Sequence, residues 1–466
     1  MSVVAAAFAL VAGLAFAEPA AGGASFAGVP AWVVWGGALV LGGATVWQLR
    51  TVPRELVLLM ITACIDMIGV LMILPLLPFY AERMGAGGFM VGLLVSSFSI
   101  AQLVSAPFWG RLSDSWGRRP VLLVALFASA VAYLVFGFAG SLPVLFVSRI
   151  VQGAGGGTVS VIQAYVADAT EPGERTKALG WLSAATNFGV AIGPVLGGYA
   201  AGWGTTLEGA GLLARGSAER FPGIGAGLAA ALLCLVNIVF AAKYLPEVRV
   251  KSDTPRPRGT SMKAVTRVVS HPGDAPSRLI WIYSIAIGAF QGLTSILALY
   301  MSRTFGATEQ TLGLLFAEIG VLSVITRVFV LGRMVDWLGE ARLSRLGTVL
   351  LALGIGLLPL VPSLEWGALV IALWPLGTAF TFPAVTGLLS KVISQHDRGL
   401  YMGVQQTFGG LSRVIFPVVL GFAFDRDASH HAPFWISATL VIATLGFSFA
   451  LPASVTARTP RPRPSE

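Results

Sequence analysis

Charge is the scarcest property of this 466-residue chain, in which only 11% of the residues are Asp, Glu, Lys or Arg and 55% are hydrophobic. A soluble globular protein carries roughly 25% charged residues, so this chain lacks the polar surface that would cover its apolar residues in water. Cysteine is nearly absent too. Cys64 and Cys234 both fall inside apolar runs, which argues against a disulfide framework or a thiolate metal site. These shortages predict an all-α polytopic membrane protein.

Several sequence motifs are also missing. No Gly-x-x-x-x-Gly-Lys-Ser/Thr loop occurs, so ATP hydrolysis is not expected, and no Ser/His/Asp or metal-ligand cluster is visible. The four histidines fall in predicted loops, and an exposed pair such as His430-His431 seldom binds metal. We therefore expect neither an enzyme nor a metal site. The net charge of +9 does not indicate nucleic-acid binding, because the basic residues lie between apolar runs.

Apolar runs of membrane-spanning length make up most of the chain. A helix needs about 20 residues to cross roughly 30 Å of hydrocarbon at 1.5 Å per residue. Twelve spans are predicted, at residues 55–80, 89–110, 119–140, 142–167, 177–203, 222–245, 279–302, 309–332, 343–362, 365–390, 398–424 and 432–452.

The pattern divides the chain into five parts. They are an N-terminal apolar extension at 1–50, a six-helix bundle at 51–245, a basic linker at 246–277, a second six-helix bundle at 278–452 and a tail at 453–466. Residues 1–17 end in Ala-Phe-Ala, which resembles a signal-peptidase site, but they lack the basic start of a signal peptide. A cleaved segment and one or two extra helices both remain open.

The basic residues between spans gather on one side of the predicted membrane. That side holds Arg50, Arg54, the Gly110–Pro120 stretch, the linker and the tail, whereas the other holds only Arg83, Arg215, Arg220, Arg303 and Arg426. Because cytoplasmic loops are the basic ones, the linker and the C-terminus are predicted to be cytoplasmic. The location expected for such a chain is the inner or plasma membrane of the cell.

The stretch Gly110–Pro120 reads Gly-Arg-Leu-Ser-Asp-Ser-Trp-Gly-Arg-Arg-Pro and is predicted to be a tight loop after the second span. We expect an inner gate here, formed by Gly110, Asp114, Gly117, Arg118, Arg119, Asp168 and Asp336. In that gate Arg118 or Arg119 would pair with Asp168, and Asp114 would suit the start of the eleventh span near Arg398. A purely topogenic and folding role for the stretch is equally compatible with these residues.

An internal repeat links the two halves. Gly110, Asp114 and Gly117 reappear 222 positions later as Gly332, Asp336 and Gly339. A second set reappears 223 positions later, namely Arg175, Gly180, Pro194 and Gly198 as Arg398, Gly403, Pro417 and Gly421. The halves are therefore predicted to be two six-helix bundles arranged as tandem pseudo-repeats.

These features together resemble the major facilitator superfamily over about residues 55–452. Gly110–Pro120 is similar to the family signature between helices two and three, and Arg149-Ile-Val-Gln-Gly153 is similar to its helix-four arginine motif. Residues 189–198 resemble the motif of the drug:proton antiporter branch. The resemblance implies a monomeric secondary transporter in the lipid bilayer. It would use protons and a small-molecule substrate, and a proton gradient would replace any cofactor.

Five ionisable residues fall inside the spans, namely Asp66, Arg149, Glu318, Arg327 and Arg413. Each needs a partner or a cavity, because a charge at the bilayer centre costs at least about 2.5–3.5 kcal/mol. Asp66 lies 11 residues beyond Glu55 and so near the midplane, where a carboxylate is suited to proton exchange. The resemblance adds that helix-one acids serve as protonation sites in several proton antiporters. The other interpretation is a structurally paired or solvated carboxylate.

Arg149 and Glu318 complete the predicted proton-coupling set. Arg149 either couples with Asp66, as the resemblance implies, or donates to neighbouring backbone. Glu318 is either a second proton site or the partner of a base on another helix, and the sequence does not separate these roles. Polar residues that are candidates for lining a cavity are Gln152, Asn187, Gln291 and Arg413, each equally suited to interhelical hydrogen bonding.

The antiporter-like motif places small residues at spacings of four, with a proline inside the helix. Its members are Gly189, Gly193, Pro194, Gly197 and Gly198. Such a strip lets a neighbouring backbone approach closely, and the proline bends the helix. The bend either seals the cavity in one transport state or serves packing alone.

The sequence thus predicts a proton-coupled antiporter that exports a small amphipathic organic compound by alternating access. Two alternatives remain, a metabolite facilitator or symporter of the same fold and a membrane receptor or scaffold without turnover.

Overall fold

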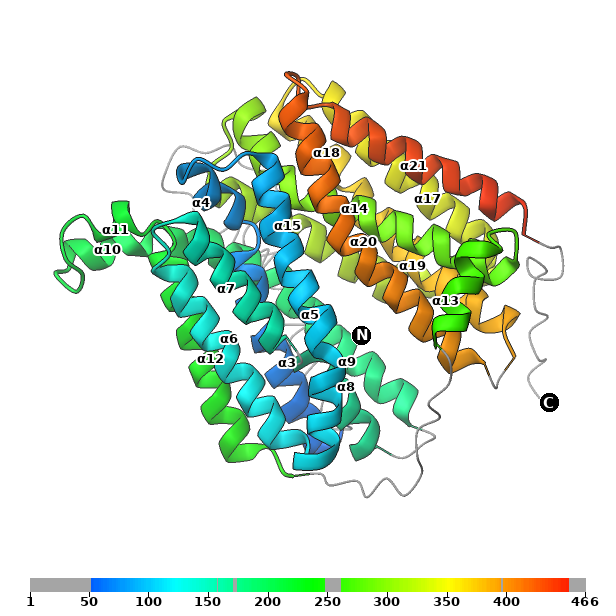
Figure 1. Cartoon of the computed structure of the whole chain (residues 1–466), viewed down its shortest axis with the longest axis horizontal. Coiled ribbons are helices and arrows are strands. Elements are labelled where there is room, and N and C mark those ends of the chain that lie inside the picture. Colours follow the sequence, from blue (N-terminus) through cyan, green and yellow to red (C-terminus); the bar gives the residue numbers. More distant parts are fainter. Residues whose placement is uncertain (1–51, 157, 171–173, 248–260, 395–396, 452–466) are drawn as a thin grey trace, which may run out of the picture. The chain divides into compact units, whose positions relative to one another are not determined.

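The computed structural model describes residues 52–156, 158–170, 174–247, 261–394 and 397–451 (Figure 1). The regular elements in these ranges are helices. The predicted extension at 1–50 and tail at 453–466 lie outside the described residues, as do residues 248–260 of the linker.

The six spans predicted for the first half coincide with helices. The helices are α3 (Arg54–Ile73), α4 (Leu77–Arg83), α5 (Gly88–Trp116), α6 (Arg118–Gly137), α7 (Leu142–Gly155), α8 (Thr158–Ala169), α9 (Arg175–Ala201), α10 (Trp203–Gly209), α11 (Ser217–Arg220) and α12 (Ile224–Tyr244). The fourth span is divided into α7 and α8, and the fifth continues beyond its predicted end into α10.

The second half follows the same plan. Its elements are α13 (Ser261–Ser270), α14 (Ala275–Phe305), α15 (Glu309–Ile325), the π-helix η1 (Thr326–Val330), α16 (Leu331–Leu338), α17 (Glu340–Leu357), the 3-10 helix η2 (Leu358–Leu360), α18 (Leu364–Ile371), α19 (Leu373–Val392), α20 (Arg398–Arg426) and α21 (Ala432–Phe449). In the described ranges ten helices are long and apolar enough to cross a membrane, and α7 is a shorter apolar helix. The all-α polytopic fold is therefore confirmed.

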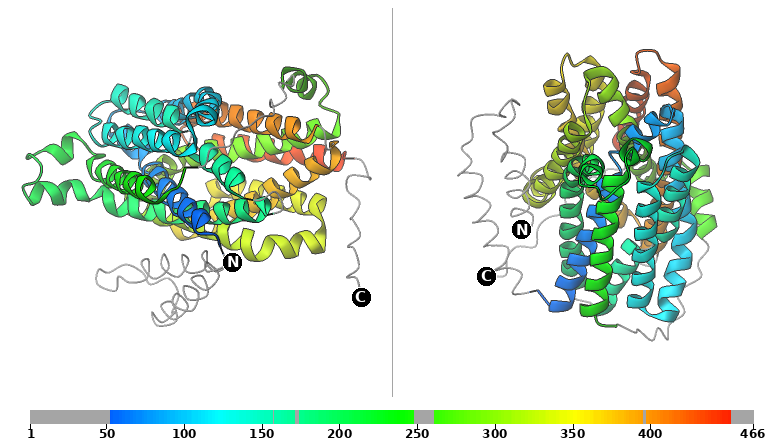
Figure 2. Two further views of the ribbon diagram at one scale, coloured as in Figure 1. Left: turned by 90° about the horizontal axis from the view of Figure 1, so that it is seen from below. Right: turned by 90° about the vertical axis from the view of Figure 1, so that its left-hand side faces the viewer.

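The described helices form two compact units. Unit 1 comprises the chain up to Asp253 together with Thr294–Ile325 and Pro417–His430, and unit 2 comprises the remainder. In unit 1, α9 packs against both α3 and α15, and α12 packs against α3 and α6. Figure 2 shows α12, in green, running beside α3, in blue. These units group segments by packing, so the predicted bundle boundaries in the sequence stay a prediction.

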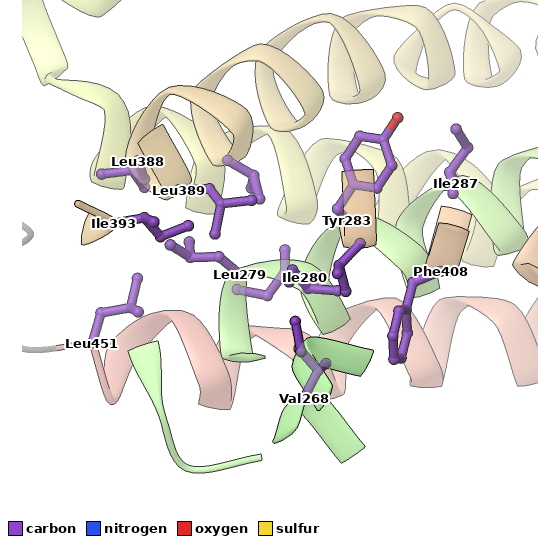
Figure 3. Close-up of a cluster of buried hydrophobic side chains, with 14 of the residues drawn as sticks. Val268, Leu279, Ile280, Tyr283, Ile287, Leu388, Leu389, Ile393, Phe408 and Leu451 are labelled. Atoms are coloured by element: carbon purple, nitrogen blue, oxygen red, sulfur yellow. The ribbon is translucent and has the colours of Figure 1, made fainter. Parts of the chain in front are cut away.

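Unit 2 is organised around a cluster of buried apolar side chains (Figure 3). Val268 of α13 and Leu279 of α14 are fully buried there, beside Leu389 of α19 and Phe408 of α20. Within α13 the buried positions Ala264 and Val268 are four residues apart and share one helix face. The end of the basic linker is therefore a packed helix and not a simple loop.

The stretch Gly110–Pro120 differs from the predicted loop. Helix α5 continues to Trp116, α6 begins at Arg118, and Gly117 alone joins them. Gly117 has φ +102°, a region that side chains with a Cβ rarely adopt, and its repeat counterpart Gly339 has φ +76°. The prediction was wrong because the residues from Arg111 to Trp116 contain no helix breaker, so a polar helix end replaces the loop.

Candidate functional site

Asp66 lies in the middle of α3 and is 4% exposed. The Thr158 hydroxyl of α8 donates a hydrogen bond of 2.8 Å to Asp66 Oδ2. Asp66 Oδ1 has no hydrogen-bond partner among the described residues. One carboxylate oxygen is therefore held in place, and the other is available for a proton.

A cavity of about 590 Å³ adjoins Asp66 in unit 1. Its walls come from three helices, with Ala63, Asp66 and Met67 on α3, Ile162, Gln163 and Ala164 on α8, and Leu179, Leu182, Ser183 and Thr186 on α9. Most of these side chains are apolar, and Asp66 is the one ionisable group among them. The volume falls in the range of about 300–1,000 Å³ that is typical of small-molecule pockets.

The glycine strip of α9 sets the position of the helix that carries Asp66. A Cβ added at Gly189 would lie 2.5 Å from the carbonyl oxygen of Cys64, and one at Gly193 would lie 2.8 Å from that of Ile68. A Cβ at Gly197 would collide with the backbone of Met72. The strip therefore packs directly on the backbone of α3, because its residues carry no side chains. Gly198 faces α15 instead, where its Cβ would lie 3.1 Å from the carbonyl oxygen of Glu309.

Arg149 of α7 is 3% exposed, and its guanidinium carbon lies 5.6 Å from the centre of the Phe98 ring. Its Nε and Nη2 find no hydrogen-bond partner among the described residues. One turn further along α7, Gln152 is buried and its Nε2 donates to the Tyr133 hydroxyl over 3.4 Å. Arg149 and Gln152, the two polar residues of the helix-four motif, thus lie on one buried face of α7.

Tyr133 joins this polar face of α7 to α3. It is 1% exposed, and its hydroxyl lies 3.2 Å from the position that a Cβ on Gly69 would occupy. Gly69 follows Asp66 by three residues and so lies on the same side of α3. Tyr133 and Thr158 were not predicted from the sequence, because neither belongs to a motif. A hydroxyl-bearing residue within an apolar run was the only available signal.

The other predicted polar residues are spread over both units. In unit 1, Glu318 is half-buried on α15, and Asn187 Nδ2 donates 2.7 Å to the Ser183 carbonyl within α9. Gln291 of α14 and Arg413 of α20 are half-buried in unit 2. The cavity beside Asp66 is therefore lined by neither Gln152 nor Asn187, and the lining roles predicted for Gln291 and Arg413 stay predictions.

Arg118, at the start of α6, is the centre of the predicted inner-gate residues in unit 1. Its side chain is 7% exposed and pairs with Asp114 and with Asp168, each at 2.8 Å. Its Nη1 also donates to the Ser113 hydroxyl. Arg119 instead donates to the carbonyl of Ala242 on α12. Arg118 thus ties the end of α5 to the end of α8.

Three further residues border this cluster or repeat it. The backbone N–H of Arg118 donates a hydrogen bond of 3.0 Å to Glu247 Oε1, a carboxylate that no sequence motif indicates. Gly110 lies within α5, where an added Cβ would meet nothing within 4 Å, so close packing does not require a glycine there. Asp336 is exposed on α16 in unit 2.

Comparisons with known sequences agree with this architecture. The family model described as Major Facilitator Superfamily matches residues 59–417 and also 279–465. Multidrug resistance protein 2 of Bacillus subtilis is 27% identical over 402 residues, covering 84% of this chain and 94% of that protein. Tetracycline resistance protein, class B, of Escherichia coli is 26% identical, covering 81% and 89% respectively.

Solved structures show the same fold. The human organic anion transporter MFSD10 aligns with a TM-score of 0.60 and 24% identity over 85% of this chain and all of that one. A D-xylose-proton symporter aligns with a TM-score of 0.66 and 17% identity over 87% and 99%. The family match spans most of the chain, and the helices, the repeat and the membrane-length apolar runs agree with it. The chain therefore belongs to the Major Facilitator Superfamily of membrane transporters.

Proposed function

We propose that this transporter is a proton-driven antiporter that exports a small amphipathic organic compound. The observation that carries the proposal is the buried carboxylate of Asp66 in the wall of a largely apolar cavity. The names of the relatives in Bacillus subtilis and Escherichia coli, which are multidrug and tetracycline resistance proteins, support the same class of substrate.

The proposed coupling uses the two oxygens of Asp66 differently. Thr158 orients the carboxylate through Oδ2, and Oδ1 gains or loses the proton. Protonation removes a charge from the cavity wall and so favours one facing state, whereas substrate in the cavity favours the other. Arg149 and Gln152 would act from α7 through Tyr133, while Glu318 would be a second proton site. The energy that drives transport comes from the proton gradient, without a bound cofactor.

The proposed setting is the inner or plasma membrane of the cell, with the central linker and the C-terminus cytoplasmic. The adjacent arginines Arg118 and Arg119, at the start of α6, support this orientation. The opposite end of unit 1, where α4 ends at Arg83 and α5 begins, would face outward. The same proposal takes the monomer as the transporting unit.

Transport in inside-out vesicles tests the proposal. An imposed pH gradient should drive uptake of a fluorescent amphipathic cation by the wild type. Asp66→Asn should reduce that gradient-driven uptake at least tenfold, because a side-chain amide, unlike a carboxylate, does not bind and release a proton. Thr158→Val should reduce it less, because the carboxylate remains but loses its orienting hydroxyl.

Asp274→Asn is the matched control, since Asp274 lies outside the site and pairs with Arg267 on the surface. It should transport like the wild type. Unchanged gradient-driven uptake by Asp66→Asn would show that the proton is carried elsewhere.

A symporter or facilitator for a metabolite is the second candidate function, because the fold alone is shared with a D-xylose-proton symporter. The direction of proton movement separates the candidates. In an antiporter, protons enter the lumen as substrate leaves it, so the lumen becomes more acidic. A symporter gives the opposite change, and a facilitator gives none.

A further inference from the structure

Two contacts in unit 1 are related by the repeat. A Cβ on Gly313 of α15 would lie 2.8 Å from the carbonyl of Pro194 on α9, and one on Gly92 of α5 would collide with the carbonyl of Pro417 on α20. Gly92 and Gly313 are 221 positions apart, and Pro194 and Pro417 are 223 apart. The pairs α9–α15 and α20–α5 therefore meet through equivalent glycine–proline contacts.

The starts of α5 and α15 also lie at equivalent positions. Each follows a glycine in a left-handed conformation, Gly85 with φ +82° and Gly306 with φ +66°. Two residues later come the N-cap positions, which are Gly87 for α5 and Thr308 for α15. The Thr308 hydroxyl accepts a hydrogen bond of 3.3 Å from the backbone N–H of Thr311, so α15 is capped by its own segment.

Helix α5 has no such cap of its own, because Gly87 has no side chain. Asp425, near the end of α20, supplies it instead. Asp425 Oδ1 accepts 2.7 Å from the N–H of Gly88, and Oδ2 accepts 2.8 Å from that of Phe89. A carboxylate that accepts two N–H groups at a positive helix end makes a charge-assisted cap.

The two caps depend on conformation differently. Thr308 and Thr311 are three residues apart, so the α15 cap persists wherever α15 moves. Asp425 is 337 residues from Gly88, so the α5 cap exists only while the end of α20 touches the start of α5. From this asymmetry we propose that Asp425 biases the transporter toward the state that is closed at the end of unit 1 where α5 begins. The inference rests on the proposed alternating-access function.

Two ion pairs in unit 1 join α4 to the second repeat and add to the contact that the Asp425 cap makes. Glu82 pairs with Arg303 at 2.9 Å, and Arg83 pairs with Glu309 at 2.5 Å, so the last two residues of α4 reach α14 and α15. Next to Asp425, the His430 ring stacks on Phe424 with centroids 4.2 Å apart. The two ion pairs join segments that are far apart in the chain, as the Asp425 cap does, whereas the His430 ring packs within its own segment.

Distance measurement between spin labels tests the proposal without any transport assay. Labels at Glu219→Cys and Ala428→Cys, in a background without Cys64 and Cys234, report separation of α20 from the N-terminal helices. Both sites are exposed and outside the contacts described above. Asp425→Ala should raise the ratio of the longer to the shorter distance about three- to tenfold, as expected for loss of a cap. An unchanged ratio would overturn the proposal.

Two further variants separate a conformational role from a structural one. Thr308→Ala should lower the melting temperature without changing the distance ratio, because its cap is present in every state. Gly87→Ser in the Asp425→Ala background gives α5 its own cap, since the backbone at Gly87 is extended and suits a capping side chain. It should restore the melting temperature and leave the distance ratio shifted.

Return of the ratio to the wild-type value in that double variant would show that Asp425 serves only the folding of α5. A shift of the ratio by Thr308→Ala as large as that of Asp425→Ala would overturn the proposal in the same way. Failure of the Asp66→Asn transport experiment leaves these distances readable, so the two proposals fail independently.

Discussion

Asp66 and its counterpart in the second repeat differ more than the helices that carry them. A shift of 221 or 222 positions takes Asp66 to Ile287 or Gly288 of α14, and neither can ionise. The same shift takes Glu318 back to two serines. By contrast, the repeat preserves its glycines and prolines, as Gly198 and Gly421 show. The two halves therefore share the residues that pack helices, and each charge inside the membrane occurs once.

The largest expected effect comes from moving the carboxylate to the other repeat. A Cβ at Gly288 would lie 2.5 Å from the Phe416 ring, so Gly288→Asp should overpack unit 2 and bury an unpaired carboxylate. Combined with Asp66→Asn, it should abolish gradient-driven transport and sharply reduce the yield of folded protein in size-exclusion chromatography.

Phe416→Ala provides the space that Gly288→Asp lacks. Added to that double variant, it should recover folded protein but not transport. Recovered transport would mean that either repeat can carry the proton.

A second difference lies in two ion pairs that occupy equivalent positions with opposite signs. Arg118 starts α6 and pairs with Asp168, whereas Glu340 starts α17 and pairs with Lys391 at 2.8 Å. Arg118 is buried and has several partners, but the Lys391 side chain is 51% exposed. Arg118→Ala should therefore cost about 3 kcal/mol of unfolding free energy, and Lys391→Ala less than about 1 kcal/mol.

Chemical denaturation of the purified protein measures both values. Equal losses would show that burial does not distinguish the two pairs. Exchange of the charges, with Arg118→Glu and Asp168→Lys together, should recover part of the loss. The second repeat already has the acidic residue, Glu340, at the start of the helix and the basic one, Lys391, as its partner.

The pairs Glu82–Arg303 and Arg83–Glu309 should have smaller effects, since their side chains are between 23% and 56% exposed. Arg303→Glu should destabilise the protein by about 0.5–1 kcal/mol, and adding Glu82→Arg should restore most of it. A double-mutant cycle on the melting transition measures the coupling. A coupling energy of zero would show that the Glu82–Arg303 pair does not stabilise the contact between α4 and α14.

The smallest effect is expected in a link that the two repeats do not share. Between α9 and α12 the chain forms α10 and α11, whereas only residues 427–431 separate α20 from α21. Glu208 accepts 2.6 Å from the N–H of Gly216 and 3.1 Å from that of Ala218. Glu208→Ala should speed amide exchange several-fold in residues 210–218 alone, as mass spectrometry can detect. Exchange changes that extend into α9 or α12 would contradict a local role.

The sequence predicted the all-α membrane fold, the repeat and the family, because apolar run length and small-residue spacing are direct consequences of a bilayer and of close helix packing. It also predicted that Gly189, Gly193 and Gly197 would admit a neighbouring backbone. It did not predict that the neighbour is α3, since a glycine strip contains no information about its partner.

The polar contacts around Asp66 and at the start of α5 were harder to predict. Thr158, Tyr133 and Asp425 act through hydrogen bonds to residues 92, 19 and 337 positions away. Such pairs depend on how the helices pack in three dimensions, which periodicity does not report. The loop predicted at Gly110–Pro120 was wrong because charge marks a membrane face but does not end a helix.

The contact between α3 and α9 has a mechanical consequence. Three glycines bring the two backbones together without intervening side chains, so there are no rotamers whose rearrangement would absorb a displacement. A tilt of one helix must then be transmitted to the other. Asp66 on α3 and Ser183 and Thr186 on α9 line the same cavity and would therefore shift together, so the proposed proton carrier would not move independently of the proposed substrate wall.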